Sequence, residues 1–240
     1  MASMPPAPHR RAPTRNRMGW TSNQINALSQ LFVDHCRTAS LPVLDLGAAY
    51  GVATLPALAA GARVIANDLD AAHLAALASL AGPNSRLQLL PGRFPNQLDL
   101  PPASLGAVHA SNVLHFLDGP ELTLGAAKIA NWLAPGGQLF IHAGTPYQQP
   151  FSRFIPQYEQ RVAAGDPWPG YVMDTAAIST HRKLTQIPPA LHLLDPQVLT
   201  RVFQAAGLVV DRAWFYRRHD LPRSMHHDGR EGVALLAHKP

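Results

Sequence analysis

The segment LDLGAAYG, residues 44–51, holds an aspartate and two glycines where an apolar run gives way to a turn of small residues. Asp45 lies within the apolar run, and Gly47 and Gly51 follow it in the turn. Small residues at such a turn let a ligand approach the backbone closely. Asp68 follows about 20 positions later, the spacing at which a carboxylate accepts hydrogen bonds from ribose hydroxyls. The pattern therefore predicts a nucleoside-containing ligand.

The spacing of the small residues argues against a dinucleotide. A G-x-G-x-x-G fingerprint that starts at Gly47 would need glycines where Ala49 and Val52 stand. A carboxylate at Asp45 would repel a pyrophosphate and attract an ammonium or sulfonium group. We therefore expect an adenosine joined to a positively charged group, with a nicotinamide-dependent oxidoreductase as the weaker alternative.

The elements that position these residues alternate between short apolar strands and helices. A first helix is expected after a cap at Thr21 or Ser22. Strands are expected at residues 43–46, 63–67, 86–90, 105–111, 138–143, 208–216 and 232–238. This alternation is typical of a parallel sheet with helices on both faces. The last two strands have only a polar loop between them, which favours a hairpin.

Two segments depart from this rhythm. Residues 144–194 hold many prolines and aromatic residues, with one helix expected around 154–164, and we interpret the segment as an inserted cap over the sheet. Residues 1–17 carry four arginines and several prolines without an acidic residue, which predicts a disordered basic tail. The remaining chain, 18–240, is expected to form one domain.

Composition limits the class of protein. The 240 residues are 47% hydrophobic, which predicts a globular chain, and no apolar run approaches the roughly 18 residues of a membrane span. Arginine far outnumbers lysine, a bias typical of a GC-rich bacterial genome, so the net charge of +5 is weak evidence for nucleic acid binding. The single cysteine, Cys36, is expected to be a packed thiol of a cytoplasmic protein.

Four segments in order resemble the class I S-adenosylmethionine-dependent methyltransferases. LDLGAAYG is similar to the family's first motif, with Ala49 where a glycine is common, and VIANDLD is similar to its second. AVHASNVLHFL and LAPGGQLFIHA are similar to the motifs of its fourth and fifth strands. The resemblance covers roughly residues 40–143. One departure is the stretch PGRF, where Arg93 replaces a common acidic residue, so that adenine recognition would depend on the backbone near Phe94.

The resemblance implies a fold and a cofactor. The fold is an α/β three-layer sandwich whose seven-stranded, mostly parallel sheet has the order 3-2-1-4-5-7-6, with the last strand antiparallel and the cap inserted after strand five. The cofactor is S-adenosyl-L-methionine, and S-adenosyl-L-homocysteine is its product. The residues expected to bind it are Asp45, Gly47, Ala48, Ala49, Gly51, Asp68, Leu69, Arg93, Phe94, Ser111 and Asn112.

The methyl acceptor is expected beyond the carboxyl ends of the strands, where ligands bind in open parallel sheets. His115 and His142 are candidate general bases, and His181 is a third. Residues expected to line the acceptor site are Trp20, Tyr147, Tyr158, Trp168, Tyr171, Arg217 and Arg218. The loop 217–231 is either solvated or an anion-binding rim. His226, His227 and Asp228 have poor spacing for a metal cage, so no metal is expected.

The expected function is O- or N-methylation of a small molecule. One alternative is a protein, peptide or RNA acceptor, although nucleic acid is disfavoured because no basic patch is interleaved with aromatic residues. Another is a non-catalytic cofactor-binding partner or sensor. The sequence does not identify the acceptor or the oligomeric state, and it gives no reason to expect a membrane partner.

Overall fold

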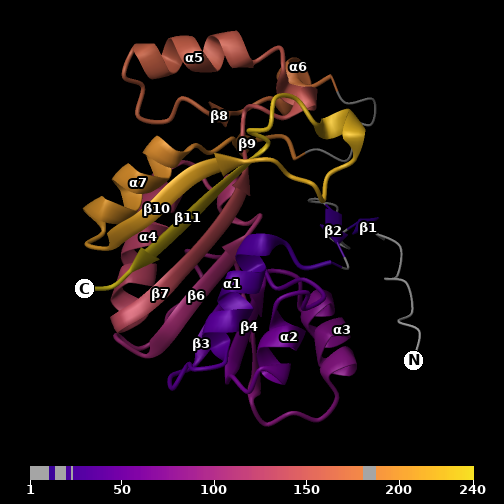
Figure 1. Cartoon of the computed structure of the whole chain (residues 1–240), viewed down its shortest axis with the longest axis vertical. Helices are drawn as coiled ribbons and strands as arrows, with labels where there is room; N and C mark the ends of the chain where they lie inside the picture. The colour runs from indigo at the N-terminus through magenta and orange to yellow at the C-terminus, as the bar shows by residue number, and fades with distance from the viewer. Residues whose placement is uncertain (1–10, 14–19, 23, 181–187) are drawn as a thin grey trace.

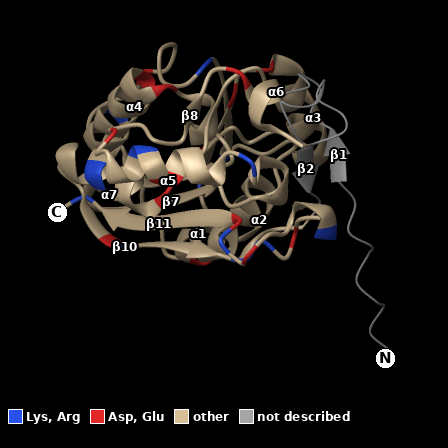
Figure 2. Ribbon diagram, turned by 90° about the horizontal axis from the view of Figure 1, so that it is seen from above, with Lys and Arg blue, Asp and Glu red and all other residues tan. Residues whose placement is uncertain are grey.

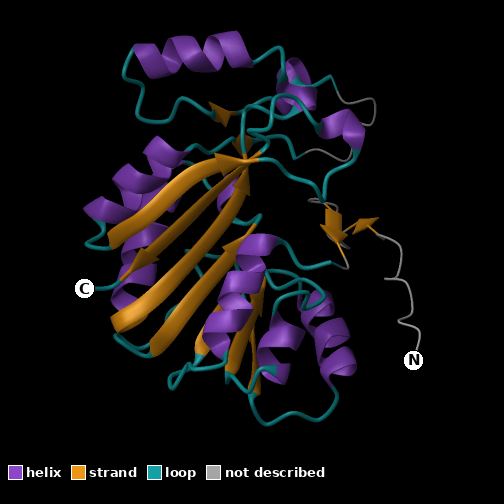
Figure 3. Cartoon of the chain, viewed as in Figure 1, coloured by secondary structure: helices purple, strands orange, loops and turns teal. Residues whose placement is uncertain are grey.

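A central sheet of seven strands organises the chain (Figures 1 and 3). The computed structural model describes residues 11–13, 20–22, 24–180 and 188–240. The strands of the sheet, in chain order, are β3 (Val43–Leu46), β4 (Val64–Asp68), β5 (Leu87–Pro91), β6 (Leu105–Ser111), β7 (Leu133–Gly144), β10 (Val209–Tyr216) and β11 (Gly232–His238). Their order in space is β10-β11-β7-β6-β3-β4-β5. This is the predicted order 3-2-1-4-5-7-6, which is confirmed.

The sheet is parallel from β5 to β7, and β11 runs antiparallel to both of its neighbours. β10 and β11 therefore form the predicted hairpin. All four residues of β3 are buried because helices cover both faces of the sheet, which explains why this strand is continuously apolar except for Asp45.

Helices on the two faces enclose separate cores. On one face α1 (Ala27–Cys36) and α2 (Thr54–Ala59) pack against Val43 and Val64, and α3 (Ala71–Ala81) packs beside them. On the other face α4 (Gly119–Trp132) and α7 (Pro196–Ala205) pack against Leu44 and Leu46. The result is the three-layer sandwich predicted from the sequence. Cys36 is 2% exposed within the first core, as expected for a packed thiol.

Helix α1 begins later than predicted. Its N-cap is Asn26, whose side chain accepts a hydrogen bond from the Ser29 amide. The predicted caps Thr21 and Ser22 lie instead in β2 (Trp20–Ser22), which pairs with β1 (Arg11–Pro13). The prediction of the cap was wrong because pairing with a segment nearer the N-terminus has no local sequence signal.

The described parts of the cap, residues 144–180 and 188–194, lie over the carboxyl ends of the parallel strands (Figure 1). Its described elements are η2 (Gln149–Phe151), α5 (Ile155–Ala163), β8 (Tyr171–Val172), α6 (Thr175–Ile178) and β9 (Leu191–His192). Side chains of α5, β8 and β9 share a small core with Tyr147 and Phe151. Helix α5 confirms the helix expected around 154–164.

Candidate functional site

The turn after β3 adopts a conformation that glycine favours. Gly47 and Gly51 have φ angles of 65° and 82°, and Ala49 between them has a φ of 47°. A Cβ atom on Gly47 would lie 2.3 Å from the Val113 Cγ2 atom, so a larger residue would displace the segment that follows β6. The turn therefore needs glycine for its backbone conformation and for its packing.

Asp68 closes this turn from the end of β4. Its Oδ2 atom accepts from the Ala49 amide at 3.0 Å, and its Oδ1 atom accepts from the Asp70 amide at 2.8 Å. The His73 Nδ1 atom lies 3.1 Å from the same Oδ1 atom. These contacts hold the carboxylate at the mouth of the turn, the position expected of a ribose ligand.

Asp45 is held from both sides beneath the turn. It is 2% exposed; its Oδ1 atom lies 2.8 Å from the His109 Nδ1 atom, and its Oδ2 atom accepts from the Thr54 hydroxyl at 2.6 Å. Buried carboxylates need such partners because desolvation disfavours their charge. The sequence predicts Asp45 as a site residue but does not predict its partner His109, which lies 64 positions away.

A cavity of about 390 Å³ opens over the carboxyl ends of β3, β4 and β6, and we call it the main cavity. All the predicted cofactor-binding residues except Gly51 line it: Asp45, Gly47, Ala48, Ala49, Asp68, Leu69, Arg93, Phe94, Ser111 and Asn112. Gly51 serves the turn through its backbone, and its amide donates to the Ala48 carbonyl at 2.8 Å. A carboxylate for ribose and a buried anion nearby fit a nucleoside that carries a positive charge.

Arg93 follows β5 and turns its guanidinium toward helix α4. Its Nη1 and Nη2 atoms donate to the two carboxylate oxygens of Glu121 at 2.5 and 3.1 Å. This hydrogen bond holds the pKa of Glu121 below its usual value. Phe94 is 5% exposed and packs edge-on against Trp132. The Arg93 side chain is thus committed to Glu121, in keeping with the expectation that recognition here falls to the backbone.

The segment after β6 brings three predicted residues to the main cavity. Asn112 has a φ of 56°, and its amide donates to the His142 carbonyl at 2.8 Å, which fixes Ser111 and Asn112 at the cavity wall. His115 lies in η1 (Leu114–Phe116) and also lines the cavity. Burial, and next the charge of Arg218, lower the pKa of His115 to about 3, so its imidazole is neutral near pH 7.

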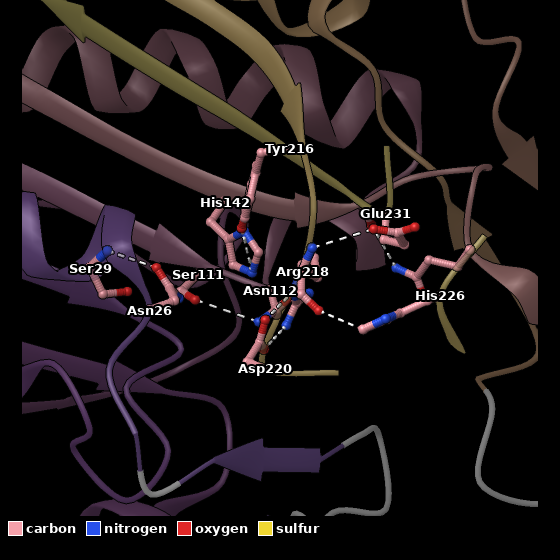
Figure 4. Close-up of polar contacts among 11 residues, drawn as sticks. Asn26, Ser29, Ser111, Asn112, His142, Tyr216, Arg218, Asp220, His226 and Glu231 are labelled. Atoms are coloured by element: carbon pink, nitrogen blue, oxygen red, sulfur yellow. Dashed lines mark hydrogen bonds and ion pairs between the residues drawn. The ribbon is translucent and has the colours of Figure 1, made fainter. Parts of the chain in front are cut away.

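His142 occupies a different environment from His115. It is fully buried on β7, its Nδ1 atom is hydrogen-bonded to the Tyr216 hydroxyl, and it is not among the residues that line the main cavity (Figure 4). Burial lowers the pKa of His142 well below its usual value and raises that of the Tyr216 hydroxyl. The His142 imidazole therefore does not line the cavity in which it is predicted to act as a base. His181 lies outside the described residues.

Two of the predicted aromatic residues, Tyr147 and Tyr158, belong to the core of the cap. Tyr147 and Tyr158 are 5% and 4% exposed and meet edge-on, with the Tyr158 hydroxyl 2.9 Å from Asp195 Oδ2. Trp168 packs against His192 and under Arg201. None of the three lines the main cavity, whereas Tyr171 lines a smaller adjacent pocket of about 290 Å³. Trp20 lies in β2, and its side chain is outside the described part.

The loop between β10 and β11, residues 217–231, covers one side of the main cavity. Arg218 is 5% exposed and forms a bidentate pair with Asp220 at 3.0 and 2.5 Å, while Arg217 is exposed. Glu231 is fully buried and its carboxylate accepts from the amides of His227 and Gly229 at 2.9 and 2.8 Å. The loop is therefore ordered by Arg218 and Glu231 although several of its residues are exposed, and the guanidinium of Arg218 is paired with Asp220.

Several lining residues are not predicted by the sequence reasoning. They come from the start of α1, the cap and the loop 217–231: Gln24, Asn26, Ser29, Gln148, Phe151, Leu191, Leu193, Asp220, Leu221 and Met225. A wall made of distant segments leaves no local pattern. Within the described ranges, no three His, Cys, Asp or Glu side chains are grouped to hold a metal ion. In those ranges no helix is both long and apolar enough to cross a membrane.

Comparisons with known proteins agree with this geometry. Residues 43–137 match the family model described as a methyltransferase domain. A methyltransferase of this cofactor class from Methanosarcina mazei is 12% identical, with a TM-score of 0.65, covering 90% of this chain and 98% of that one. Another from Mesorhizobium loti is 18% identical, with a TM-score of 0.61 and coverage of 89% and 99%. None of the curated proteins matches the chain.

A third similar structure is the glycopeptide N-methyltransferase MtfA in complex with S-adenosyl-L-methionine. It is 19% identical, with a TM-score of 0.55, and the match covers 88% of this chain and 92% of that one. At these identities the structures show the fold alone. Residues 43–137 match a methyltransferase domain, and the chain has the fold of the S-adenosylmethionine-dependent methyltransferases to which it is similar.

Proposed function

We propose that the protein methylates a small, largely apolar molecule at an oxygen or nitrogen atom. The main support for the proposal is that the part of the main cavity next to Asn112 and His115 is lined largely by apolar side chains. The apolar side chains there come from η1, the cap and the loop 217–231: Phe116, Phe151, Leu191, Leu193, Leu221 and Met225. Enclosed apolar walls with few polar groups are typical of small-molecule sites.

The cofactor residues supply binding and orientation. Asp68 is placed to accept from the ribose hydroxyls, and the turn at Gly47 gives the nucleoside close access to the backbone. When bound, the cofactor supplies an electrophilic methyl group on a sulfonium. The apolar wall excludes water from the acceptor, and alignment of the nucleophile accounts for much of the rate in such a transfer.

His115 is the proposed general base for an acceptor that must lose a proton. It lines the main cavity, and because its pKa is lowered to about 3 it is neutral near pH 7 and has a free lone pair. Such a weak base accepts a proton best when methyl transfer is far advanced and the acceptor has become acidic. His142 stays a second prediction, since its imidazole is hydrogen-bonded to Tyr216.

Labelled methyl donor and fractionated extract from the source organism test the proposal. We expect label in the low-molecular-weight fraction after incubation with the purified protein. Label in the protein or RNA fraction would replace the small-molecule acceptor with a macromolecular one. No transfer to any fraction, despite binding of S-adenosyl-L-homocysteine, would favour a non-catalytic partner or sensor.

A peptide is the second candidate acceptor. Its support is the fold shared with MtfA, a glycopeptide N-methyltransferase. RNA has less support, because the Lys and Arg positions on the described part of the ribbon are scattered among Asp and Glu positions and form no continuous basic strip in the view of Figure 2. The basic residues Arg10, Arg15 and Arg17 of the N-terminal segment lie outside the described residues. A cytoplasmic location stays part of the proposal.

A further inference from the structure

Four buried side chains form a continuous hydrogen-bonded chain beneath the main cavity. The Ser29 Oγ atom lies 2.9 Å from the His109 Nε2 atom, and the His109 Nδ1 atom lies 2.8 Å from Asp45 Oδ1. The Thr54 hydroxyl donates to the other oxygen of Asp45 at 2.6 Å. Each of the four side chains is at most 3% exposed. Ser29, Asp45 and His109 all line the main cavity.

An ionised Asp45 and a neutral His109 together determine the direction of each hydrogen bond in this chain. Asp45 only accepts when ionised, so His109 Nδ1 carries a proton and donates it to Oδ1. The Nε2 atom of a neutral His109 is then an acceptor, and the Ser29 hydroxyl donates to it. Because the Ser29 hydroxyl proton is engaged with His109, the Ser29 oxygen can only accept a hydrogen bond from a ligand.

In the arrangement with Asp45 ionised and His109 neutral, the four side chains carry one negative charge. No Lys or Arg of the described ranges forms an ion pair with this carboxylate. A buried carboxylate normally has a cationic partner or several hydrogen bonds. A cation that reaches Ser29 would gain from both the serine lone pair and the charge behind it.

We propose that Ser29 accepts a hydrogen bond from the ammonium group of the bound methyl donor, and that Asp45 holds Ser29 in this role through His109. The inference rests on the proposed use of the main cavity by S-adenosyl-L-methionine. Ser29 is then a binding residue and His109 a positioning residue. Asp45 provides the charge from behind His109.

The same order of Ser, His and Asp activates a nucleophile in hydrolases. Such a serine needs free backbone amides nearby to stabilise the oxyanion. Here the Ser29 amide is already occupied, since it donates to the Asn26 side chain at 2.8 Å in the N-cap of α1 (Figure 4). The arrangement therefore favours a fixed acceptor over a nucleophile.

Calorimetry with two ligands that differ by one group tests the proposal. The first ligand is S-adenosyl-L-homocysteine, and the second is its analogue with hydrogen in place of the α-amino group. Hydrogen bonds to charged groups contribute about 1.5–3 kcal/mol, so the wild type should prefer the amine by about tenfold to a hundredfold. In Ser29→Ala this preference should fall to a few-fold, with the affinity for the deamino analogue nearly unchanged.

Two further variants separate binding from folding effects. His109→Asn keeps a donor for Asp45 but is too short to reach Ser29, and it should reduce the amine preference as Ser29→Ala does. Ser79→Ala is the matched control, because Ser79 is an exposed serine of helix α3. It should leave both affinities unchanged.

Other outcomes would overturn the inference. Equal losses for the two ligands in Ser29→Ala would mean that Ser29 only packs the site, and a retained preference would place the ammonium elsewhere. Hydrolysis of p-nitrophenyl acetate that disappears in Ser29→Ala would identify a nucleophile instead. If neither ligand binds the wild type, the proposed function itself fails. Histidine ¹⁵N shifts should also show a protonated Nδ1 and an unprotonated Nε2 at His109.

Discussion

Arg218 and Asn112 join two segments that are 106 positions apart, through a 3.1 Å hydrogen bond from Arg218 Nη1 to Asn112 Oδ1. Asn112 follows β6 and Arg218 lies at the start of the loop 217–231, and both residues line the main cavity (Figure 4). One guanidinium thus connects the proposed cofactor side of the cavity with the proposed acceptor side. Because Asp220 neutralises it, this connection does not require an anionic acceptor.

Replacement of Arg218 by methionine should release the loop 217–231. The variant loses the bonds to Asn112 and Asp220 and leaves the Asp220 carboxylate half-buried without its cation. We expect amide hydrogen exchange in the loop to become at least about tenfold faster, since local opening costs less. Arg217→Met is the control, because Arg217 is exposed; equal exchange in the two variants would contradict the assigned role of Arg218.

Gly47→Ala should lower stability more than Gly165→Ala. Both glycines have a left-handed φ, 65° and 74°, so both variants incur backbone strain. A Cβ atom at Gly47 meets Val113 at 2.3 Å, whereas nothing lies within 4 Å of one at Gly165. We expect the free energies of unfolding, measured in urea, to differ by about 1–3 kcal/mol. Equal values would mean that the Val113 segment yields without cost.

Asp68→Asn should weaken binding of S-adenosyl-L-homocysteine by about tenfold or more, because the amide loses the charge and one of two acceptors. Calorimetry measures the change. Asp70→Asn is the matched control, since Asp70 caps α3 and asparagine retains that function. A similar loss in both variants would point to damage at the start of α3 rather than to a lost ribose contact.

Acid should destabilise the protein through its buried histidines. Burial lowers the pKa of His192 to about 4 and that of His115 to about 3, below the value of 6.5 in the unfolded chain. The unfolded state then binds more protons, so the stability that these groups confer is complete above pH 6.5 and falls as the pH drops toward 4. Each contributes a slope of about 1.4 kcal/mol per pH unit within this window.

The variant His192→Gln should flatten the pH dependence of the unfolding free energy between pH 6.5 and 4. The exposed His219 provides the control, and His219→Gln should keep the wild-type slope. An unchanged slope in His192→Gln would mean that His192 is protonated in the folded protein.

The two candidate bases give different expectations. His115→Gln should reduce the initial rate of label transfer by about 100-fold if the acceptor loses a proton to it. His142→Gln should mainly lower the melting temperature, because His142 is fully buried beside Tyr216. The opposite pattern would assign the base to His142, and an unchanged rate in both would mean that the acceptor needs no base.

The sheet and the turn were predictable because their signals are local. Alternating apolar strands and helices predict the parallel sheet, whereas the strand order was predicted from the resemblance of four motifs to a methyltransferase family. Asp45 and Asp68 are recognisable from their positions next to apolar runs. The parallel sheet and the ligand site expected at its carboxyl edge need only neighbouring residues and the rules of parallel sheets.

The walls of the site were not predictable in the same way. Ser29 and His109 are 80 positions apart and meet only when α1 packs on β6. Tyrosine is a common residue in binding sites, yet Tyr147 and Tyr158 pack against each other in the core of the cap, and Tyr158 also packs against Phe154. Burial of an aromatic side chain depends on its tertiary neighbours, which single positions in the sequence do not specify.

Glu231 has a consequence for how this enzyme can be redesigned. The Glu231 carboxylate, just before β11, accepts hydrogen bonds from the amides of His227 and Gly229. At the other end of the loop, Arg218 donates a hydrogen bond to Asn112. Leu221 and Met225, which face the main cavity, lie between these two anchors. We therefore expect that other side chains at positions 221 and 225 would change which molecules fit the main cavity, because the hydrogen bonds of Arg218 and Glu231 hold the loop without them.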